Sequence, residues 1–145
     1  GGYFSSRLMN NIREDKGFTY GIYSVLNSRK NGGYWYITTE VGSHVCEAAI
    51  AEIYKEIDIL KSQLVPDEEL ELVRNYMLGS ILSQLDGPFN IAKTVKGLIT
   101  FGLKLEYFYQ LVETIKTITP QQIQALAIKY LDQNEFYEVV VGKMD

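Results

Sequence analysis

The chain has 145 residues, of which 46% are hydrophobic and 12% aromatic, so it is neither disordered nor fibrous. Its 14 basic and 18 acidic side chains give a net charge of −4, which argues against a nucleic-acid or membrane partner. The single cysteine, Cys46, cannot form an internal disulfide. That fits the cytoplasm slightly better than the cell exterior, and the compartment stays open.

In the N-terminal third, the spacing of apolar residues changes from helical to alternating. Residues 3–16 carry apolar side chains near helical spacing, and Gly17 is placed to end that helix. From Tyr20 the period becomes two, and a second alternating run, rich in aromatic and β-branched residues, covers 34–41. Turn-forming residues 28–33 separate the two runs, so the sequence predicts a helix followed by a β-hairpin.

The remainder is mainly helical. Apolar periodicity and terminal signals place helices over residues 43–64, 66–85, 89–101, 105–117 and 119–131. Ser43 is the expected cap of the first, and Thr119 and Gln122 form the expected capping box of the last. Residues 136–142 predict a closing strand. This order indicates one α+β domain over residues 1–145, with an antiparallel sheet covered on one face by several helices.

His44 lies three positions before Glu47 with Cys46 between them, a spacing that could place metal ligands on one face of a helix. Zinc needs three or four converging ligands, and the sequence contains no second histidine. We therefore predict a solvated His44, a buried Cys46 and no metal site. With one histidine, a Ser-His-Asp triad would have to use His44, and no nucleophile-elbow motif is present. The sequence also contains no phosphate-binding Gly-x-x-x-x-Gly-Lys loop.

Arg13 and Tyr20 are the remaining candidates. Arg13 would lie near the end of the first helix and Tyr20 at the start of the following strand, so both could reach the same end of the sheet. A guanidinium presents a fork of donors, and a Tyr hydroxyl can donate to a carbonyl oxygen. Spacing alone favours a structural role, in which Arg13 pairs with Glu14 or a helix C-terminus and Tyr20 is core. The alternative is that both hold a ligand.

A set of residues at defined spacing occupies the first 25 positions: Gly2, Phe4, Ser6, Arg7, Leu8, Arg13, Glu14, Gly17 and Tyr20. With looser matches over residues 65–81, 119–131 and 139–142, it resembles the pitrilysin family of zinc metallopeptidases. That family includes insulin-degrading enzyme and mitochondrial processing peptidase. The resemblance implies the LuxS/mitochondrial processing peptidase-like fold, in which two homologous halves face each other across a closed chamber.

In that family one half carries the zinc motif His-x-x-Glu-His, and the other supplies an Arg and a Tyr that hydrogen-bond the peptide. By resemblance these substrate-binding residues are Arg13 and Tyr20. Because the zinc motif is absent here, the chain resembles the zinc-free, C-terminal-type half, with no catalytic residue and no metal ligand of its own. The isolated chain is expected to be inactive.

The resemblance therefore implies a substrate-positioning domain of a zinc endopeptidase. Its expected partners are a peptide substrate and a zinc-bearing homologous domain or subunit, which would hold the zinc. The alternative is a non-proteolytic structural or assembly subunit of the same fold. Family domains begin with strands ahead of Gly2, so we also expect N-terminal truncation, an uncovered strand edge and self-association.

Overall fold

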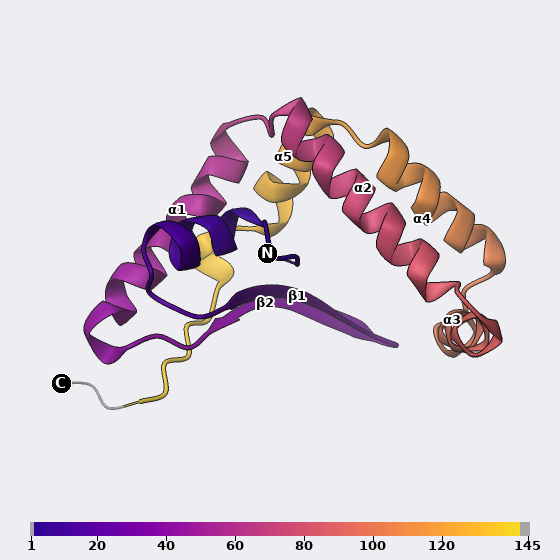
Figure 1. Cartoon of the computed structure of the whole chain (residues 1–145), viewed down its shortest axis with the longest axis horizontal. Helices are drawn as coiled ribbons and strands as arrows, with labels where there is room; N and C mark the ends of the chain where they lie inside the picture. The colour runs from indigo at the N-terminus through magenta and orange to yellow at the C-terminus, as the bar shows by residue number, and fades with distance from the viewer. Residues whose placement is uncertain (1, 143–145) are drawn as a thin grey trace. The chain divides into compact units, whose positions relative to one another are not determined.

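The computed structural model describes residues 2–142, and the chain divides into two compact units. The first unit runs to Gln63 and resumes at Ala125, and the second is Leu64–Gln124. The elements in chain order are η1 (Met9–Asp15), β1 (Ile22–Arg29), β2 (Gly32–Thr39), η2 (Ser43–Val45), α1 (Cys46–Ser62), α2 (Asp67–Gln84), α3 (Pro88–Thr100), α4 (Leu105–Thr117), α5 (Pro120–Tyr130) and η3 (Gln133–Glu135) (Figure 1). The α+β class is confirmed; the single-domain organisation stays a prediction.

The predicted hairpin is present, and its register gives the two faces different roles. β1 pairs antiparallel with β2 from Ile22 opposite Thr39 to Arg29 opposite Gly32, which leaves a two-residue turn. Side chains alternate across a strand, so Ile22 and Ile37 share the inner face, against which η1 and α1 both pack. The opposite, outer face carries tyrosines that reach solvent. The helices of this unit thus cover one face of the sheet.

The core of the first unit lies where η1 crosses the inner face of the hairpin. Ile12 of η1 and Ile22 of β1 are both 0% exposed, and Leu8 and Met9 complete the buried cluster. Ile53 of α1 packs against it. The N–H of Ile22 donates to the sulfur of Met9 at 3.4 Å. Ile22, the first residue of β1, is thus both buried against η1 and hydrogen-bonded to it.

The first helix ends as predicted but is wound differently. It is a π-helix over Met9–Asp15, and the N–H of Lys16 donates to the carbonyl of Asn11 at 3.0 Å, five residues back. Gly17 then adopts a positive φ of 65°, which reverses the chain toward β1. Residues 3–6 form turns rather than the helical start that periodicity predicts, because serines favour turns and caps over helix interiors. π-Helical turns are rare and occur frequently at functional sites.

The predicted closing strand over residues 136–142 is wrong for this structure. Alternate side chains of the segment do face the protein. The Phe136 ring centre lies 5.7 Å from that of Trp35, and Glu138 accepts a hydrogen bond from the Tyr54 hydroxyl at 2.6 Å. This hydrogen bond raises the pKa of Tyr54. Tyr137 between them is 96% exposed. A strand needs a neighbouring backbone, however, and within residues 2–142 the sheet contains only β1 and β2.

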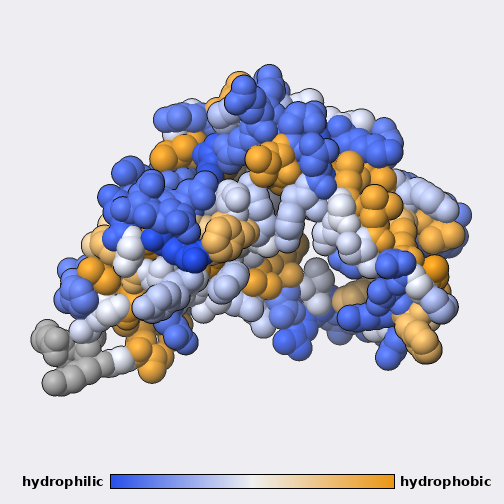
Figure 2. Space-filling model, in the orientation of Figure 1, coloured by the Kyte–Doolittle hydropathy of each residue, from blue (hydrophilic) through white to orange (hydrophobic). Residues whose placement is uncertain are grey.

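The second unit packs α2 against α3 and α4. Gly87, with φ 82°, separates α2 from α3, which begins at Pro88. Arg74 of α2 donates to the backbone carbonyl of Ile118 and pairs with Glu71 at 3.0 Å, which ties α2 to the end of α4. Hydrophobic side chains still reach the surface over these helices (Figure 2), among them Phe89, Ile99, Leu105 and Tyr109.

The two predicted helix caps have different outcomes. The capping box is confirmed, because the N–H of Gln122 donates to the Thr119 hydroxyl at 3.2 Å and the N–H of Thr119 donates to the Gln122 side chain at 2.9 Å. Ser43 does not cap α1: it opens the 3₁₀ turn η2, and Val45 precedes α1 without a side-chain cap. Within residues 2–142, no helix is both long and apolar enough to span a bilayer.

Candidate functional site

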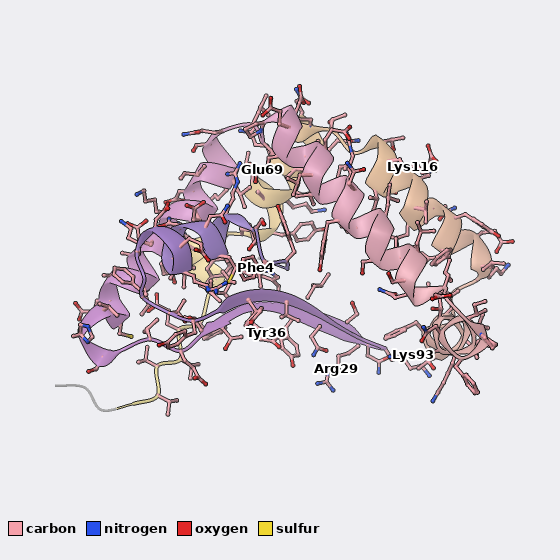
Figure 3. All side chains as sticks on the ribbon, in the orientation of Figure 1. Phe4, Arg29, Tyr36, Glu69, Lys93 and Lys116 are labelled. Carbon is pink, nitrogen blue, oxygen red and sulfur yellow. The ribbon has the colours of Figure 1, made fainter. Side chains whose placement is uncertain are left out.

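Arg13 lies in the last turn of η1, held between an aromatic ring and a carboxylate. Its guanidinium carbon is 4.4 Å from the centre of the Phe4 ring, and its Nη1 is 3.4 Å from Oε1 of Glu14. Figure 3 shows Phe4 beside η1. The ring contact orients the guanidinium plane without using any of its five N–H donors, and Glu14 engages one edge. Arg13 is half-buried, and it keeps donors for a further acceptor.

Tyr20 is 98% exposed, although the backbone on either side of it is fixed. The Thr19 hydroxyl donates to the carbonyl of Glu40 at 2.7 Å and accepts from the N–H of Gly21 at 3.1 Å. The Thr39 hydroxyl donates to the carbonyl of Gly21 at 3.0 Å. We call these threonines, Thr19 and Thr39, the threonine clamp. The threonine clamp joins the first residues before β1 to the end of β2 by hydrogen bonds, and the Tyr20 side chain between Thr19 and Gly21 extends into solvent.

The structure places Arg13 in the last turn of η1 and Tyr20 in the segment that joins η1 to β1. Between them, Gly17 reverses the chain and Phe18 packs against the core, so the intervening segment is anchored to the core. Within the described chain no hydrogen bond links the two side chains. The expected contact of Arg13 with Glu14 is present, whereas a core position for Tyr20 is wrong. Their substrate-binding role stays a prediction.

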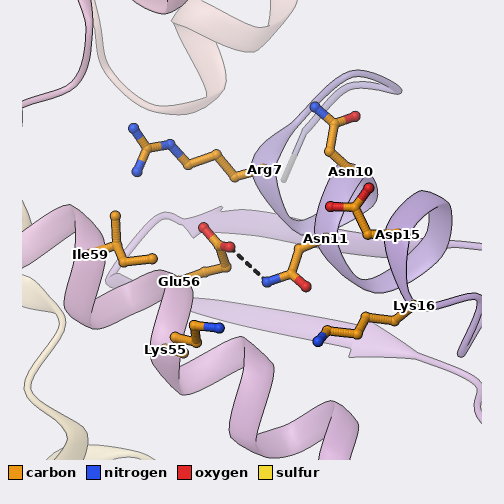
Figure 4. A pocket seen from close by; sticks show the side chains of 8 residues that line it. All are labelled: Arg7, Asn10, Asn11, Asp15, Lys16, Lys55, Glu56 and Ile59. Atoms are coloured by element: carbon orange, nitrogen blue, oxygen red, sulfur yellow. Dashed lines mark hydrogen bonds between the residues drawn. The ribbon is translucent and has the colours of Figure 1, made fainter.

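A polar hollow lies between η1 and α1. Its lining is Arg7, Asn10, Asn11, Asp15, Lys16, Lys55, Glu56 and Ile59 (Figure 4). Asn11 donates to Glu56 at 2.7 Å and to Glu52 at 3.0 Å, and Lys16 pairs with Glu52 at 3.2 Å. These groups satisfy one another. These hydrogen bonds and this ion pair therefore hold η1, which carries Arg13, against α1.

Glu52 at the centre of these contacts should make stability depend on pH. The hydrogen bond from Asn11, reinforced by Lys16 and Lys55, lowers the pKa of Glu52 from 4.5 to about 2. A depressed carboxyl pKa contributes stability that is present above pH 4.5 and lost as pH falls toward 2. We expect Glu52→Gln to be less stable than wild type at pH 7 and the difference to shrink toward pH 2. Urea unfolding followed by Trp35 fluorescence measures it, and a difference independent of pH would contradict the assignment.

The described residues do not form a zinc site. His44 is exposed, with its ring against Gly42, and Cys46 is half-buried. Across residues 2–142, no group of three or more His, Cys, Asp or Glu side chains converges in a way that could hold a metal ion. Zinc sites require at least three such ligands. The donor set of the described chain does not fit the zinc of a metallopeptidase.

We therefore predict that the isolated chain binds no zinc stoichiometrically and cleaves no peptide. Zinc analysis after dialysis, together with a fluorogenic peptide assay, checks both statements. His44→Ala is the matched variant, because it removes the only histidine. One equivalent of zinc in the wild-type chain, lost in His44→Ala, would overturn the zinc-free assignment.

The threonine clamp is the part of the site that sequence reasoning missed. Thr19 and Thr39 are far apart in the chain and belong to no chemical motif. Their meeting follows from the register that sets Ile22 opposite Thr39, and periodicity predicts a hairpin without fixing that register. A threonine at each end of the predicted hairpin was the only available signal.

The described chain combines an α+β fold with Arg13 and the exposed Tyr20 near the η1–β1 junction, and residues 2–142 contain no metal-ligand cluster. A profile of the family described as "Peptidase M16 inactive domain" matches residues 1–77. The chain belongs to this family, which confirms the resemblance to the zinc metallopeptidases.

Relatives agree with this placement. The chain is 26% identical over 128 residues to "Uncharacterized zinc protease YmxG" of Bacillus subtilis (strain 168), an alignment that covers 88% of this chain and 31% of that protein. Among solved structures, the peptidase M16 inactive domain from Pseudomonas fluorescens gives a TM-score of 0.80 at 24% identity, covering 91% of this chain and 31% of that one.

A protease from Helicobacter pylori gives a TM-score of 0.77 at 14% identity, covering 92% of this chain and 32% of that one. At 24% and 14% identity, these two structures show similarity of fold alone. The chain thus spans about a third of the length of these relatives.

Proposed function

We propose that this chain is the substrate-positioning, zinc-free domain of a zinc-dependent endopeptidase. The observation that carries the proposal is the Tyr20 phenol, which is almost fully exposed on a backbone that the threonine clamp holds. A large aromatic ring gains nothing for the fold in that position. A fixed, exposed donor is what recognition of a bound ligand requires.

The chemistry available to the pair is hydrogen bonding to a peptide backbone. An extended peptide offers carbonyl oxygens, which accept from a phenol and from a guanidinium. Arg13 is oriented by Phe4 and Glu14, and Tyr20 is positioned by its fixed neighbours, so little ordering remains to be done when the peptide binds. The part of this chain is to bind and orient the peptide; zinc and its ligands would belong to a homologous partner half.

The length of the relatives supports a partner half. The chain covers 31% of the zinc protease relative and 31% of the Pseudomonas fluorescens structure. Apolar side chains exposed on α3 and α4, including Phe89 and Leu105, also suit a domain that functions within a larger assembly. The zinc-bearing partner is a domain or subunit of the same fold, as the resemblance implies.

Reconstitution tests the proposal. The zinc-bearing half of the peptidase is titrated with this chain, and cleavage of a fluorogenic peptide is followed. We expect activity to rise and to saturate at one equivalent, while the zinc content of the partner half stays constant. Binding at one equivalent without any gain in cleavage would contradict the positioning role and favour the alternative, a structural or assembly subunit.

A further inference from the structure

The outer face of the β-hairpin carries an ordered row of aromatic side chains that the fold does not use. We call the set Tyr23, Val25, Arg29, Tyr34 and Tyr36 the tyrosine face. Its three tyrosines are 38–56% exposed, whereas the opposite face holds the buried Ile22. Figure 3 shows Tyr36 and Arg29 on the side of the hairpin away from Phe4.

The row runs along β1 and β2 from the segment that follows Tyr20 to the hairpin tip. A Cβ at Gly21 would lie 3.0 Å from the Tyr23 hydroxyl, so the Tyr23 ring rests against the residue that follows Tyr20. The Tyr34 and Tyr36 rings are 5.8 Å apart, and the Arg29 guanidinium lies 5.9 Å from the Tyr34 ring. The side chains therefore form one surface along β1 and β2.

The surface also has a defined length and charge. β1 has eight residues, about 26 Å at roughly 3.3 Å per residue, which an extended peptide of about eight residues would match. Residues 16–39 contain Lys16, Arg29 and Lys30 and no Asp or Glu, in a chain whose net charge is −4. Lys16 is paired with Glu52, so Arg29 and Lys30 leave the tip of the hairpin basic.

We propose that the tyrosine face binds the stretch of an extended peptide substrate that continues from Tyr20, with an acidic side chain placed about seven or eight residues along. Tyrosines provide amphipathic contact area with few rotamers to order, and they suit varied apolar side chains. Arg29, stacked on Tyr34, supplies the charge that selects a carboxylate at the far end. This inference rests on the proposed function, because it assumes that Tyr20 contacts the same peptide.

The test compares two fluorescein-labelled peptides of about ten residues with alternating Val and Ser. One carries Glu and the other Lys about eight residues from the end that Tyr20 would hold. Their affinities for the 145-residue chain are measured by anisotropy. We expect the Glu peptide to bind about fivefold more tightly. Arg29→Glu should reverse that preference, and Tyr36→Ala should weaken the binding of both peptides.

Lys30→Glu is the matched control, because it makes the same charge change in the adjacent turn, and it should reduce the preference for Glu less than Arg29→Glu does. Trp35, on the inner face, reports by fluorescence that each variant is folded. Equal affinity for both peptides, no binding of either, or a preference lost equally in Lys30→Glu would overturn the inference. So would variants of the tyrosine face that abolish only self-association in sedimentation, because a second copy would then be the occupant.

These outcomes are distinguishable from failure of the proposed function, since the assay involves no cleavage. Loss of the distal charge preference with reconstitution intact overturns the tyrosine-face inference alone. A preserved preference without reconstituted cleavage overturns only the peptidase role.

Discussion

Replacing Tyr20 by Phe in the assembled peptidase should lower kcat/KM by about five- to 150-fold and leave folding and zinc content intact. A hydrogen bond lost from a water-excluded site costs about 1–3 kcal/mol, and each 1.36 kcal/mol is a factor of ten in rate. The substitution removes one hydroxyl and retains the ring. Because Tyr20 is almost fully exposed and lies outside the core, its effect should appear in activity alone.

A matched control is available in Tyr137→Phe. Tyr137 is as exposed as Tyr20 but belongs to the segment that follows η3 and not to the η1–β1 junction. We expect its kcat/KM to stay within about twofold of wild type. Measuring melting temperature and kcat/KM on the same preparations separates a contact with the substrate from a general effect on the protein.

Arg13→Ala should cost at least as much as Tyr20→Phe, because hydrogen bonds from a charged donor are stronger. It also removes the contact with Phe4 and the ion pair with Glu14, so part of its effect can be structural. The double variant should lose less than the product of the two single effects if both donors hold one region of the peptide. Unchanged kcat/KM per folded molecule in both single variants would end the case for this site.

The sequence predicted where helices and strands occur better than it predicted how they pack and pair with one another. Apolar periods of two and of 3.6 residues reflect burial within one element, and they placed the hairpin, α1 to α5 and the Gly17 stop close to the observed bounds. Periodicity does not encode the π-winding of η1 or the packing of Met9 and Ile12 against Ile22. The strand expected over 136–142 failed for a related reason: alternation indicates extended backbone, and a sheet also needs a partner strand.

The candidate site was predicted through resemblance and not through residue chemistry. Spacing alone favoured a buried Tyr20, since a tyrosine opening an alternating run commonly faces the core. Its exposure results from the bend between Gly17 and Ile22 and from the threonine clamp. The clamp joins residues that are distant in sequence, which periodicity does not pair. Arg13 illustrates the opposite case, because its contact with Glu14 is local and was anticipated.

The second large effect concerns the helix that carries Arg13. Ile12→Ala should destabilise the chain by about 2–5 kcal/mol, because Ile12 is 0% exposed and removal of its side chain leaves a cavity between η1 and Ile22. Ile12→Val keeps most of the volume and should cost only about 0.5–1.5 kcal/mol. Urea unfolding followed by the fluorescence of Trp35, the only tryptophan, measures both.

Leu26→Ala is the surface control, since Leu26 lies on the same hairpin but is largely exposed, and it should change stability by no more than about 0.5 kcal/mol. A cost for Ile12→Ala as small as this control would mean that η1 is not packed on the hairpin. Arg13 and Tyr20 would then lack a common support. If the expected cost is found, folded Ile12→Val should retain the activity of the assembled peptidase, because Glu52 and Asn11 still fasten η1 to α1.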